Sequence, residues 1–182
     1  MTKKINGPTI LTILRILLAI LFFIFILLPY QWSKITALSL FIVAAITDYI
    51  DGRWARKDKL VTDLGAFLDP LADKTLVSLA LLALINLQVI PVWVFAIILV
   101  RDLAIDGIRM SSAKKNITIS ASKLGKVKTA VQMVSLVFLQ IYLFTDNQII
   151  YIIGTTILYL ALLFTIVSGV EYITKGWKRL AK

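Results

Sequence analysis

Long apolar segments dominate this sequence and constrain its fold more than any other feature. A helix that crosses the hydrocarbon core of a membrane needs roughly 20 mostly apolar residues. The 182-residue chain contains six such stretches, at approximately residues 9–29, 34–56, 64–87, 91–113, 123–144 and 148–174. Only 16% of its residues are charged, whereas a soluble domain has about a quarter. We therefore expect an all-α, polytopic membrane protein with six transmembrane helices, folded as one domain over residues 1–182.

The basic residues are distributed unevenly between the two ends of these segments. The chain carries 20 Lys and Arg against 10 Asp and Glu, a net charge of +10. With six crossings both termini lie on one side, and every Lys and Arg except Lys34 falls on that side. Cytoplasmic loops are enriched in Lys and Arg, so we expect a multi-pass plasma-membrane protein with both termini in the cytoplasm. Tyr30, Trp32, Trp93 and Tyr151 then lie near the outer interface. Anionic lipid headgroups explain much of the loop charge, and no nucleic-acid partner is expected.

The chain lacks two residue types on which much enzyme chemistry depends. It contains neither His nor Cys, which excludes metal sites built on imidazole or thiolate, His-dependent triads, disulfides and thiol redox chemistry. Any chemistry must rest on carboxylates, Lys and Arg, hydroxyl groups and the backbone.

Aspartates occur where they are energetically costly. Charged residues inside a membrane span usually mark a polar cavity or an ion site. Asp48 and Asp51 are three residues apart in the second segment, and Asp69 and Asp73 are four apart in the third, so each pair shares one helix face. A short connection makes these segments antiparallel neighbours, so the two pairs can face each other.

Four facing carboxylates need a counter-charge. A set of oxygen ligands without His or Cys favours hard cations such as Mg²⁺, Mn²⁺ or Ca²⁺, and a pair of such ions can orient phosphate oxygens during a displacement. The alternative is a set of structural ion pairs with Arg53, Arg56 and Lys74. Small residues accompany the acids, and they serve either close helix packing or the approach of a ligand.

These residues form a specific pattern. It reads Asp48-x-x-Asp51-Gly52-x-x-Ala55-Arg56, then eight residues, then Gly65-x-x-x-Asp69-x-x-x-Asp73. This resembles the complete signature of the CDP-alcohol phosphatidyltransferases, and the resemblance extends over nearly the whole chain.

The resemblance implies an activity and a role for each signature residue. Members of the family transfer a phosphatidyl group from a CDP-linked lipid to an alcohol and release CMP, at a site that opens on the cytoplasmic face of a homodimer. It implies two bound Mg²⁺ or Mn²⁺ ions, with Asp48, Asp51, Asp69 and Asp73 as ligands and Asp73 also as the base for the acceptor hydroxyl. The residues implied to lie against CDP are Asp48, Gly52, Ala55, Arg56 and Gly65.

Other segments resemble the glycerol-phosphate branch of the family, the phosphatidylglycerophosphate synthases. They are residues 62–74, Asn6-x-Pro8-x-x-Leu11-Thr12-x-x-Arg15, Arg101-Asp102, Gly107-Ile108-Arg109, residues 124–129 and Ser168-Gly169-x-Glu171-Tyr172. The branch implies CDP-diacylglycerol and sn-glycerol 3-phosphate as substrates. Thr9 and Asp102 stand where the branch usually has Asn and Glu, and Asp106 is an additional acid.

A phosphorylated acceptor needs a cationic pocket. Arg101 and Arg109 are eight residues apart on one stripe of the fourth segment, and Lys126 and Lys128 begin the fifth. We expect these four residues to bind the acceptor phosphate, with Arg15 lining the same cavity. The alternative pairs Arg109 with Asp106 and leaves the two lysines as ordinary cytoplasmic charges.

Three other functions fit parts of the pattern. The same chemistry could use another acceptor, such as phosphatidylglycerol in a cardiolipin synthase or an inositol phosphate. A divalent-cation transporter also needs intramembrane acids, although transport sites usually lie near the bilayer midplane. A purely structural membrane protein would tolerate neutralisation of the aspartates.

Overall fold

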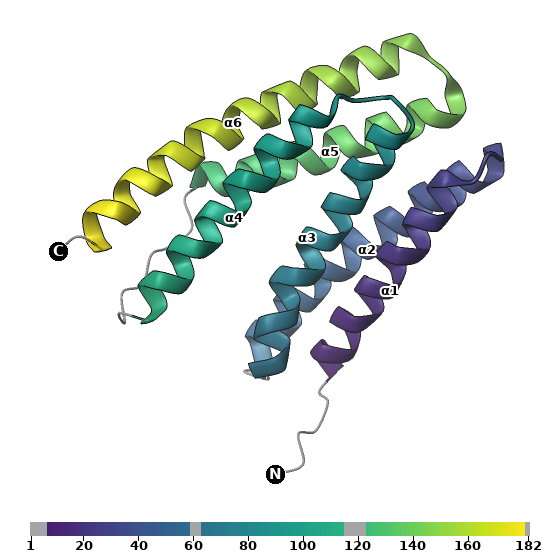
Figure 1. Ribbon diagram of the computed structural model, residues 1–182. Helices are drawn as coiled ribbons and strands as arrows, with labels where there is room; N and C mark the ends of the chain where they lie inside the picture. The colour runs from purple at the N-terminus through teal and green to yellow at the C-terminus, as the bar shows by residue number, and fades with distance from the viewer. Residues whose placement is uncertain (1–6, 59–62, 115–122, 181–182) are drawn as a thin grey trace. The chain divides into compact units, whose positions relative to one another are not determined.

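The computed structural model describes residues 7–58, 63–114 and 123–180. At residues 7–9, 48–58, 63–70, 73, 109, 113–114, 123, 126 and 175–180 only the backbone is described. The described residues form six α-helices and no strand (Figure 1). The helices are α1 (Gly7–Leu27), α2 (Gln31–Asp58), α3 (Asp63–Asn86), α4 (Val92–Lys114), α5 (Lys123–Thr145) and α6 (Gln148–Leu180). The predicted segments match these helices closely, except that α6 continues beyond residue 174 to Leu180.

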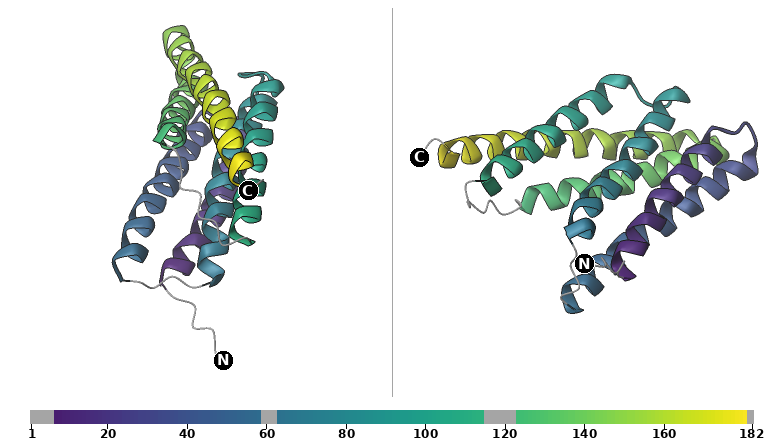
Figure 2. Two further views of the ribbon diagram at one scale, coloured as in Figure 1. Left: turned by 90° about the vertical axis from the view of Figure 1, so that its left-hand side faces the viewer. Right: turned by 60° about the horizontal axis from the view of Figure 1, so that its bottom comes forward.

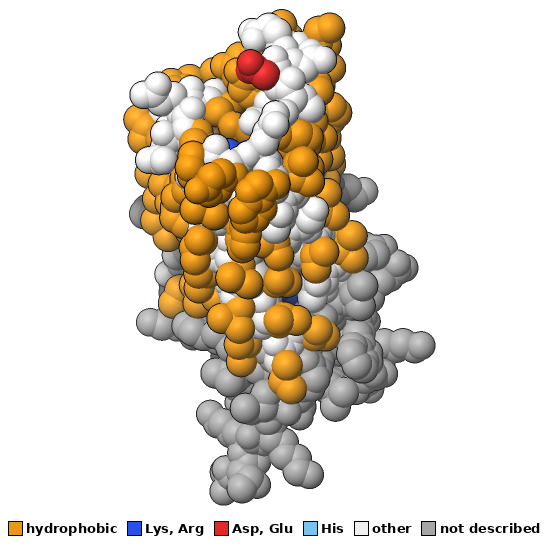
Figure 3. Space-filling view, turned by 90° about the vertical axis from the view of Figure 1, so that its right-hand side faces the viewer, with side chains coloured by type: hydrophobic (Ala, Val, Ile, Leu, Met, Phe, Trp, Pro, Cys, Tyr) orange, Lys and Arg blue, Asp and Glu red, His pale blue; other side chains and the backbone are white. Residues whose placement is uncertain are grey.

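The helices have the length and apolar character of a membrane protein. Three contain stretches long and apolar enough to cross a membrane: Ile10–Leu27, Val127–Thr145 and Gln148–Thr174. Shorter apolar stretches occupy Gln31–Thr47 in α2 and Lys74–Asn86 in α3. Large hydrophobic side chains are exposed along the helices and cover much of the face in Figure 3. The all-α membrane fold is confirmed, whereas a membrane crossing by all six helices stays a prediction.

The chain divides into two compact units, which are described separately. Unit 1 comprises Met1–Leu87 with Leu143–Thr145, and unit 2 comprises Gln88–Tyr142 with Asp146–Lys182. The expectation of a single domain stays a prediction.

Unit 1 is held together by stripes of buried residues on α1, α2 and α3. The inner stripe of α1 repeats every three or four residues, as expected for a helix that packs on one face, through Thr12, Arg15, Ala19, Phe22 and Ile26. Small residues such as Ala37 and Ala44 on α2 and Ala72, Ala80 and Ala83 on α3 are fully buried. Small side chains let membrane helices approach closely, and α1 packs against both α2 and α3 (Figures 1 and 2).

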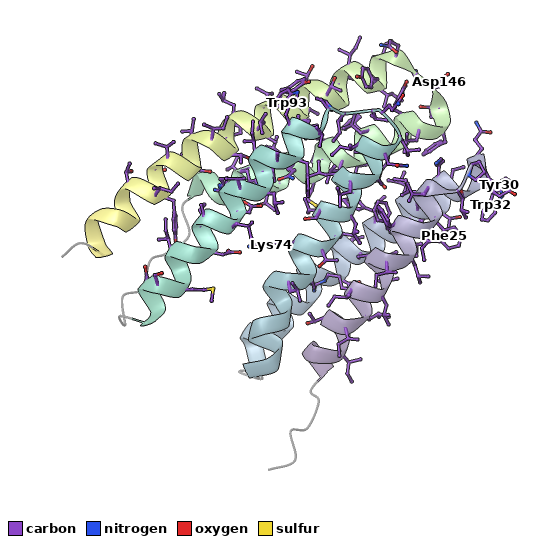
Figure 4. All side chains as sticks on the ribbon, in the orientation of Figure 1. Phe25, Tyr30, Trp32, Lys74, Trp93 and Asp146 are labelled. Atoms are coloured by element: carbon purple, nitrogen blue, oxygen red, sulfur yellow. The ribbon has the colours of Figure 1, made fainter. Side chains whose placement is uncertain are left out.

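The connection between α1 and α2 explains why Lys34 lies on the side of the helices that has no other Lys or Arg. The last carbonyl groups of a helix have no partner within that helix. The Lys34 ammonium donates a hydrogen bond to the carbonyl of Ile26, in the last turn of α1. Trp32 stacks on Tyr30 with ring centroids 5.8 Å apart, beside this connection (Figure 4). Lys34 thus caps a helix and has a structural role on the side with few basic residues.

In unit 2 a two-residue link joins α5 to α6. Asp146 adopts a left-handed conformation, with φ of 50°, and its amide donates to the carbonyl of Tyr142 over 2.9 Å. Asn147 then caps α6, because its Oδ1 accepts a hydrogen bond from the amide of Ile149 over 2.9 Å. The short link makes α5 and α6 antiparallel neighbours. The buried Ser135 hydroxyl on α5 donates to the carbonyl of Gly154 on α6 over 2.9 Å.

Gly154 allows α5 and α6 to pack closely. A Cβ atom at this position would lie 2.8 Å from Leu139 Cδ2 and 3.2 Å from the Leu139 backbone nitrogen. Gly107 in α4 has nothing within 4 Å of the equivalent position. An added methyl group would therefore clash with Leu139 at position 154 and meet open space at position 107.

We predict that Gly154→Ala lowers the apparent melting temperature of the purified protein and that Gly107→Ala does not. Alanine is intrinsically favoured over glycine in a helix by about 1 kcal/mol, but forcing extra volume into a packed interface costs about 1–3 kcal/mol. Thermal unfolding in detergent, followed by loss of monodisperse protein, measures both effects. Equal melting temperatures for the two variants would contradict close packing at Gly154.

Candidate functional site

The signature aspartates lie on two neighbouring helices of unit 1. Asp48 and Asp51 belong to α2, and Asp69 and Asp73 belong to α3. These helices belong to the same unit and contact each other (Figure 1), whereas the expectation that the two pairs of aspartates face each other stays a prediction. The side chains of the four aspartates lie outside the described residues, so their ligand roles stay predictions. The same holds for Gly52, Ala55, Arg56 and Gly65.

Arg15 is a fully buried charged side chain of unit 1. It lies on the inner stripe of α1 and is only 1% exposed, which makes it the largest fully buried side chain among the described residues. A buried guanidinium requires partners, and Arg15 has one. Its expected place among the acceptor-binding residues stays a prediction, because the other four belong to unit 2.

In unit 2, one carboxylate joins two cations from different helices. Asp102 Oδ1 on α4 accepts a hydrogen bond from its neighbour Arg101 over 2.9 Å and one from the Lys128 ammonium of α5 over 3.1 Å. Asp102 Oδ2 lies 3.1 Å from the same ammonium. Lys128 is 4% exposed and makes a further contact besides this one, so Asp102 offsets part of the cost of burying its charge. We call Arg101, Asp102 and Lys128 the charged triad.

Helix α6 holds the other side of Arg101. The Arg101 Nη2 atom donates to the Ser168 hydroxyl over 2.6 Å, and Ser168 is completely buried. A Cβ atom on the adjacent Gly169 would lie 2.9 Å from Arg101 Cγ. The Ser168-Gly169 pair therefore provides both a hydrogen bond and the space that the arginine stem occupies.

The structure brings together part of the predicted acceptor pocket. Arg101 and Lys128 meet through Asp102 as members of the charged triad. The side chains of Arg109 and Lys126 lie outside the described residues, so the alternative pairing of Arg109 with Asp106 is also untested.

Sequence reasoning missed the roles of Asp102, Ser168 and Gly169 in this arrangement. The sequence shows Asp102 as part of the resembling Arg101-Asp102 segment and as a departure from the usual Glu, and it assigns no role to Ser168-Gly169. The sequence offered one signal, which was the pair of small residues Ser168-Gly169 on the last helix, where an arginine inside the membrane could be accommodated. The hydrogen bond between Arg101 and Ser168 joins residues 67 positions apart, and helical spacing does not reveal such a contact.

The charged triad links α4 to α5 through two cations and one carboxylate. Two cations share one carboxylate, and Arg101 is 15% exposed at its side chain. Guanidinium and ammonium groups side by side are suited to a phosphate group. The acids Asp106 and Glu171 each make a contact as well.

Comparison with known proteins identifies relatives over almost the full chain. Residues 5–167 match the CDP-alcohol phosphatidyltransferase family. The chain is 36% identical to the CDP-diacylglycerol–glycerol-3-phosphate 3-phosphatidyltransferase of Bacillus subtilis (strain 168), over 96% of this chain and 97% of that protein. It is also 36% identical to the enzymes of the same name from Yersinia enterocolitica, over 97% and 98% of the two chains, and Escherichia coli (strain K12), over 94% of each.

Proposed function

This chain belongs to the CDP-alcohol phosphatidyltransferase family, and on that premise we propose that it transfers the phosphatidyl group of CDP-diacylglycerol to sn-glycerol 3-phosphate. The products are phosphatidylglycerophosphate and CMP, so the enzyme serves phospholipid biosynthesis. One observation carries the proposal: all eight signature residues occupy α2 and α3 of a chain 36% identical to relatives that bear this activity's name.

The donor set on α2 and α3 fits divalent cations. Asp48, Asp51, Asp69 and Asp73 provide only carboxylate oxygens, which suit Mg²⁺ and Mn²⁺. Two such ions, when bound, neutralise the diphosphate and stabilise the charge on departing CMP. Without a counter-charge, four carboxylates on neighbouring helices would repel both one another and the substrate.

The chain's own residues perform the remaining steps. Asp73 accepts the proton of an acceptor hydroxyl, whose oxygen attacks the phosphorus that carries the diacylglycerol group. The bond from this phosphorus to the oxygen of CMP breaks, and CMP leaves with the electron pair. Arg56 binds a phosphate of the CDP group, while Gly52, Ala55 and Gly65 leave room for the nucleotide.

The acceptor phosphate binds to the cations of α4 and α5. Arg101 and Lys128 are held together in the charged triad, and we include Arg109, Lys126 and Arg15 in the same role. A cationic pocket favours a phosphorylated acceptor over serine or an uncharged lipid alcohol.

The enzyme works at the cytoplasmic face of the plasma membrane. The excess of Lys and Arg on one side of the helices supports this orientation. Exposed aromatic side chains, among them Trp32 and Trp93 (Figure 4), are suited to the opposite interface. The diacyl chains stay in the lipid while sn-glycerol 3-phosphate enters from the cytoplasm, and the active form is a homodimer.

We predict that Asp69→Asn lowers CMP release by more than about 100-fold while the protein remains folded. Loss of a negative ligand weakens both metal binding and neutralisation of the diphosphate. CMP is measured after mixing purified protein, CDP-diacylglycerol, sn-glycerol 3-phosphate and Mg²⁺ or Mn²⁺. The matched control is Asp146→Asn, which removes a carboxylate from the α5–α6 link, where asparagine accepts the left-handed backbone. Full activity of Asp69→Asn would refute the proposed metal site.

We predict that CMP release depends on the acceptor supplied. The pocket of cations should give release with sn-glycerol 3-phosphate and less than about a tenth of that rate with glycerol, serine or phosphatidylglycerol. Release with phosphatidylglycerol or an inositol phosphate in place of sn-glycerol 3-phosphate would reassign the acceptor. Uptake of divalent metal into vesicles with no CMP release would refute the enzyme and favour a transporter.

A further inference from the structure

The carboxylate of Asp102 brings two positive charges close together. Arg101 Nη1 and the Lys128 ammonium both bond to the same oxygen, Asp102 Oδ1. Because each nitrogen lies within 3.1 Å of that oxygen, the two nitrogens are no more than about 6 Å apart. At this distance in a partly desolvated site two cations repel each other appreciably. The intervening carboxylate offsets this repulsion.

Arg101 retains hydrogen-bonding capacity in this arrangement. A guanidinium has five N–H donors, and Arg101 uses one on Asp102 and one on Ser168. Its Nε is buried without a hydrogen-bond partner among the described residues. Within the described part of the chain, a second N–H on each terminal nitrogen also has no hydrogen-bond partner. A group held by two contacts that keeps free donors is preorganised to bind an oxyanion.

Contacts on the opposite side of Arg101 limit its movement. The Ser168 hydroxyl accepts from Nη2, and the absence of a side chain at Gly169 leaves room for the arginine stem. Asp102 and Ser168 thus hold the two ends of the guanidinium from α4 and α6. The carboxylate itself would repel a phosphate dianion, so Asp102 is unsuited to contact the acceptor phosphate directly.

We infer that Asp102 is a positioning residue, which holds Arg101 and Lys128 side by side as one binding site for the acceptor's phosphate. The inference rests on the proposed function and assigns a role to a residue that touches neither the phosphate nor the metals. Ser168 supports the same geometry from α6. If the charged triad only clamped α4 to α5, its loss would lower the stability of the protein. It would then leave the ratio of the two KM values, for sn-glycerol 3-phosphate and for CDP-diacylglycerol, unchanged.

The test separates the two substrates kinetically. We expect Asp102→Asn to raise the KM for sn-glycerol 3-phosphate about tenfold or more, because the charge that offsets the repulsion between Arg101 and Lys128 is lost. The KM for CDP-diacylglycerol should change less than about twofold. Asp102→Glu, which restores the charge, should recover most of the lost affinity.

A second variant avoids burying uncompensated charge. Ser168→Ala removes one hydrogen bond of Arg101 and leaves every charge in place, so it should raise the KM for sn-glycerol 3-phosphate about threefold or more. The matched control is Ser39→Ala, because within the described part of the chain the exposed Ser39 hydroxyl bonds to the carbonyl of Ile35 in its own helix, over 3.0 Å. If Asp102→Asn does not fold, the KM of Ser168→Ala for sn-glycerol 3-phosphate tests the inference instead.

The outcomes distinguish this inference from the proposed function. A wild-type protein that releases no CMP with sn-glycerol 3-phosphate refutes the function. An active wild type whose folded Asp102→Asn and Ser168→Ala variants keep an unchanged KM for sn-glycerol 3-phosphate refutes only the positioning role. An equal rise in the KM of both substrates, or a fall in kcat alone, also refutes it.

Discussion

Charge placed inside an apolar helical bundle must be neutralised where it lies, and this requirement organises the whole protein. A lone buried charge costs several kcal/mol, whereas a paired one can be retained. Arg15 is buried in unit 1 with a partner, and Lys128 is buried in unit 2 against Asp102. Even Lys34, at the end with few basic residues, bonds to a helix carbonyl. The contacts of the buried Arg15 and Lys128 both lower the cost of burying their charges and hold these side chains in position.

Fixed charges of this kind are suited to a reaction between phosphate groups at a membrane surface. Helices α2 and α3 carry the acidic signature, and α4 and α5 carry the cations of the charged triad. Under the proposed function the acids serve the CDP-lipid through divalent cations, and Arg101 and Lys128 serve the phosphorylated acceptor. Within unit 2, the small residues Gly154 and Gly169 let α5 and α6 and the stem of Arg101 approach closely.

Much of the fold could be predicted from local sequence features. Pro29 and Pro91 border helix ends, and Asp146-Asn147 forms a tight link, so segment boundaries followed from residues that act locally. The position of Arg101 and Arg109 on one stripe of the fourth segment likewise indicated a polar role. The contacts of Asp102 and Ser168 could not be predicted, because they depend on which faces of α4, α5 and α6 meet. The metal-binding arrangement of Asp48, Asp51, Asp69 and Asp73 still rests on their spacing and on the family signature.

The stoichiometry of the reaction tests the central claim most directly. Purified protein is incubated with CDP-diacylglycerol, sn-glycerol 3-phosphate and Mg²⁺ or Mn²⁺, and both products are quantified by mass spectrometry. Phosphatidyl transfer requires one molecule of phosphatidylglycerophosphate for each CMP released. Release of CMP with phosphatidic acid in place of phosphatidylglycerophosphate would mean that water is the acceptor, and it would contradict the account.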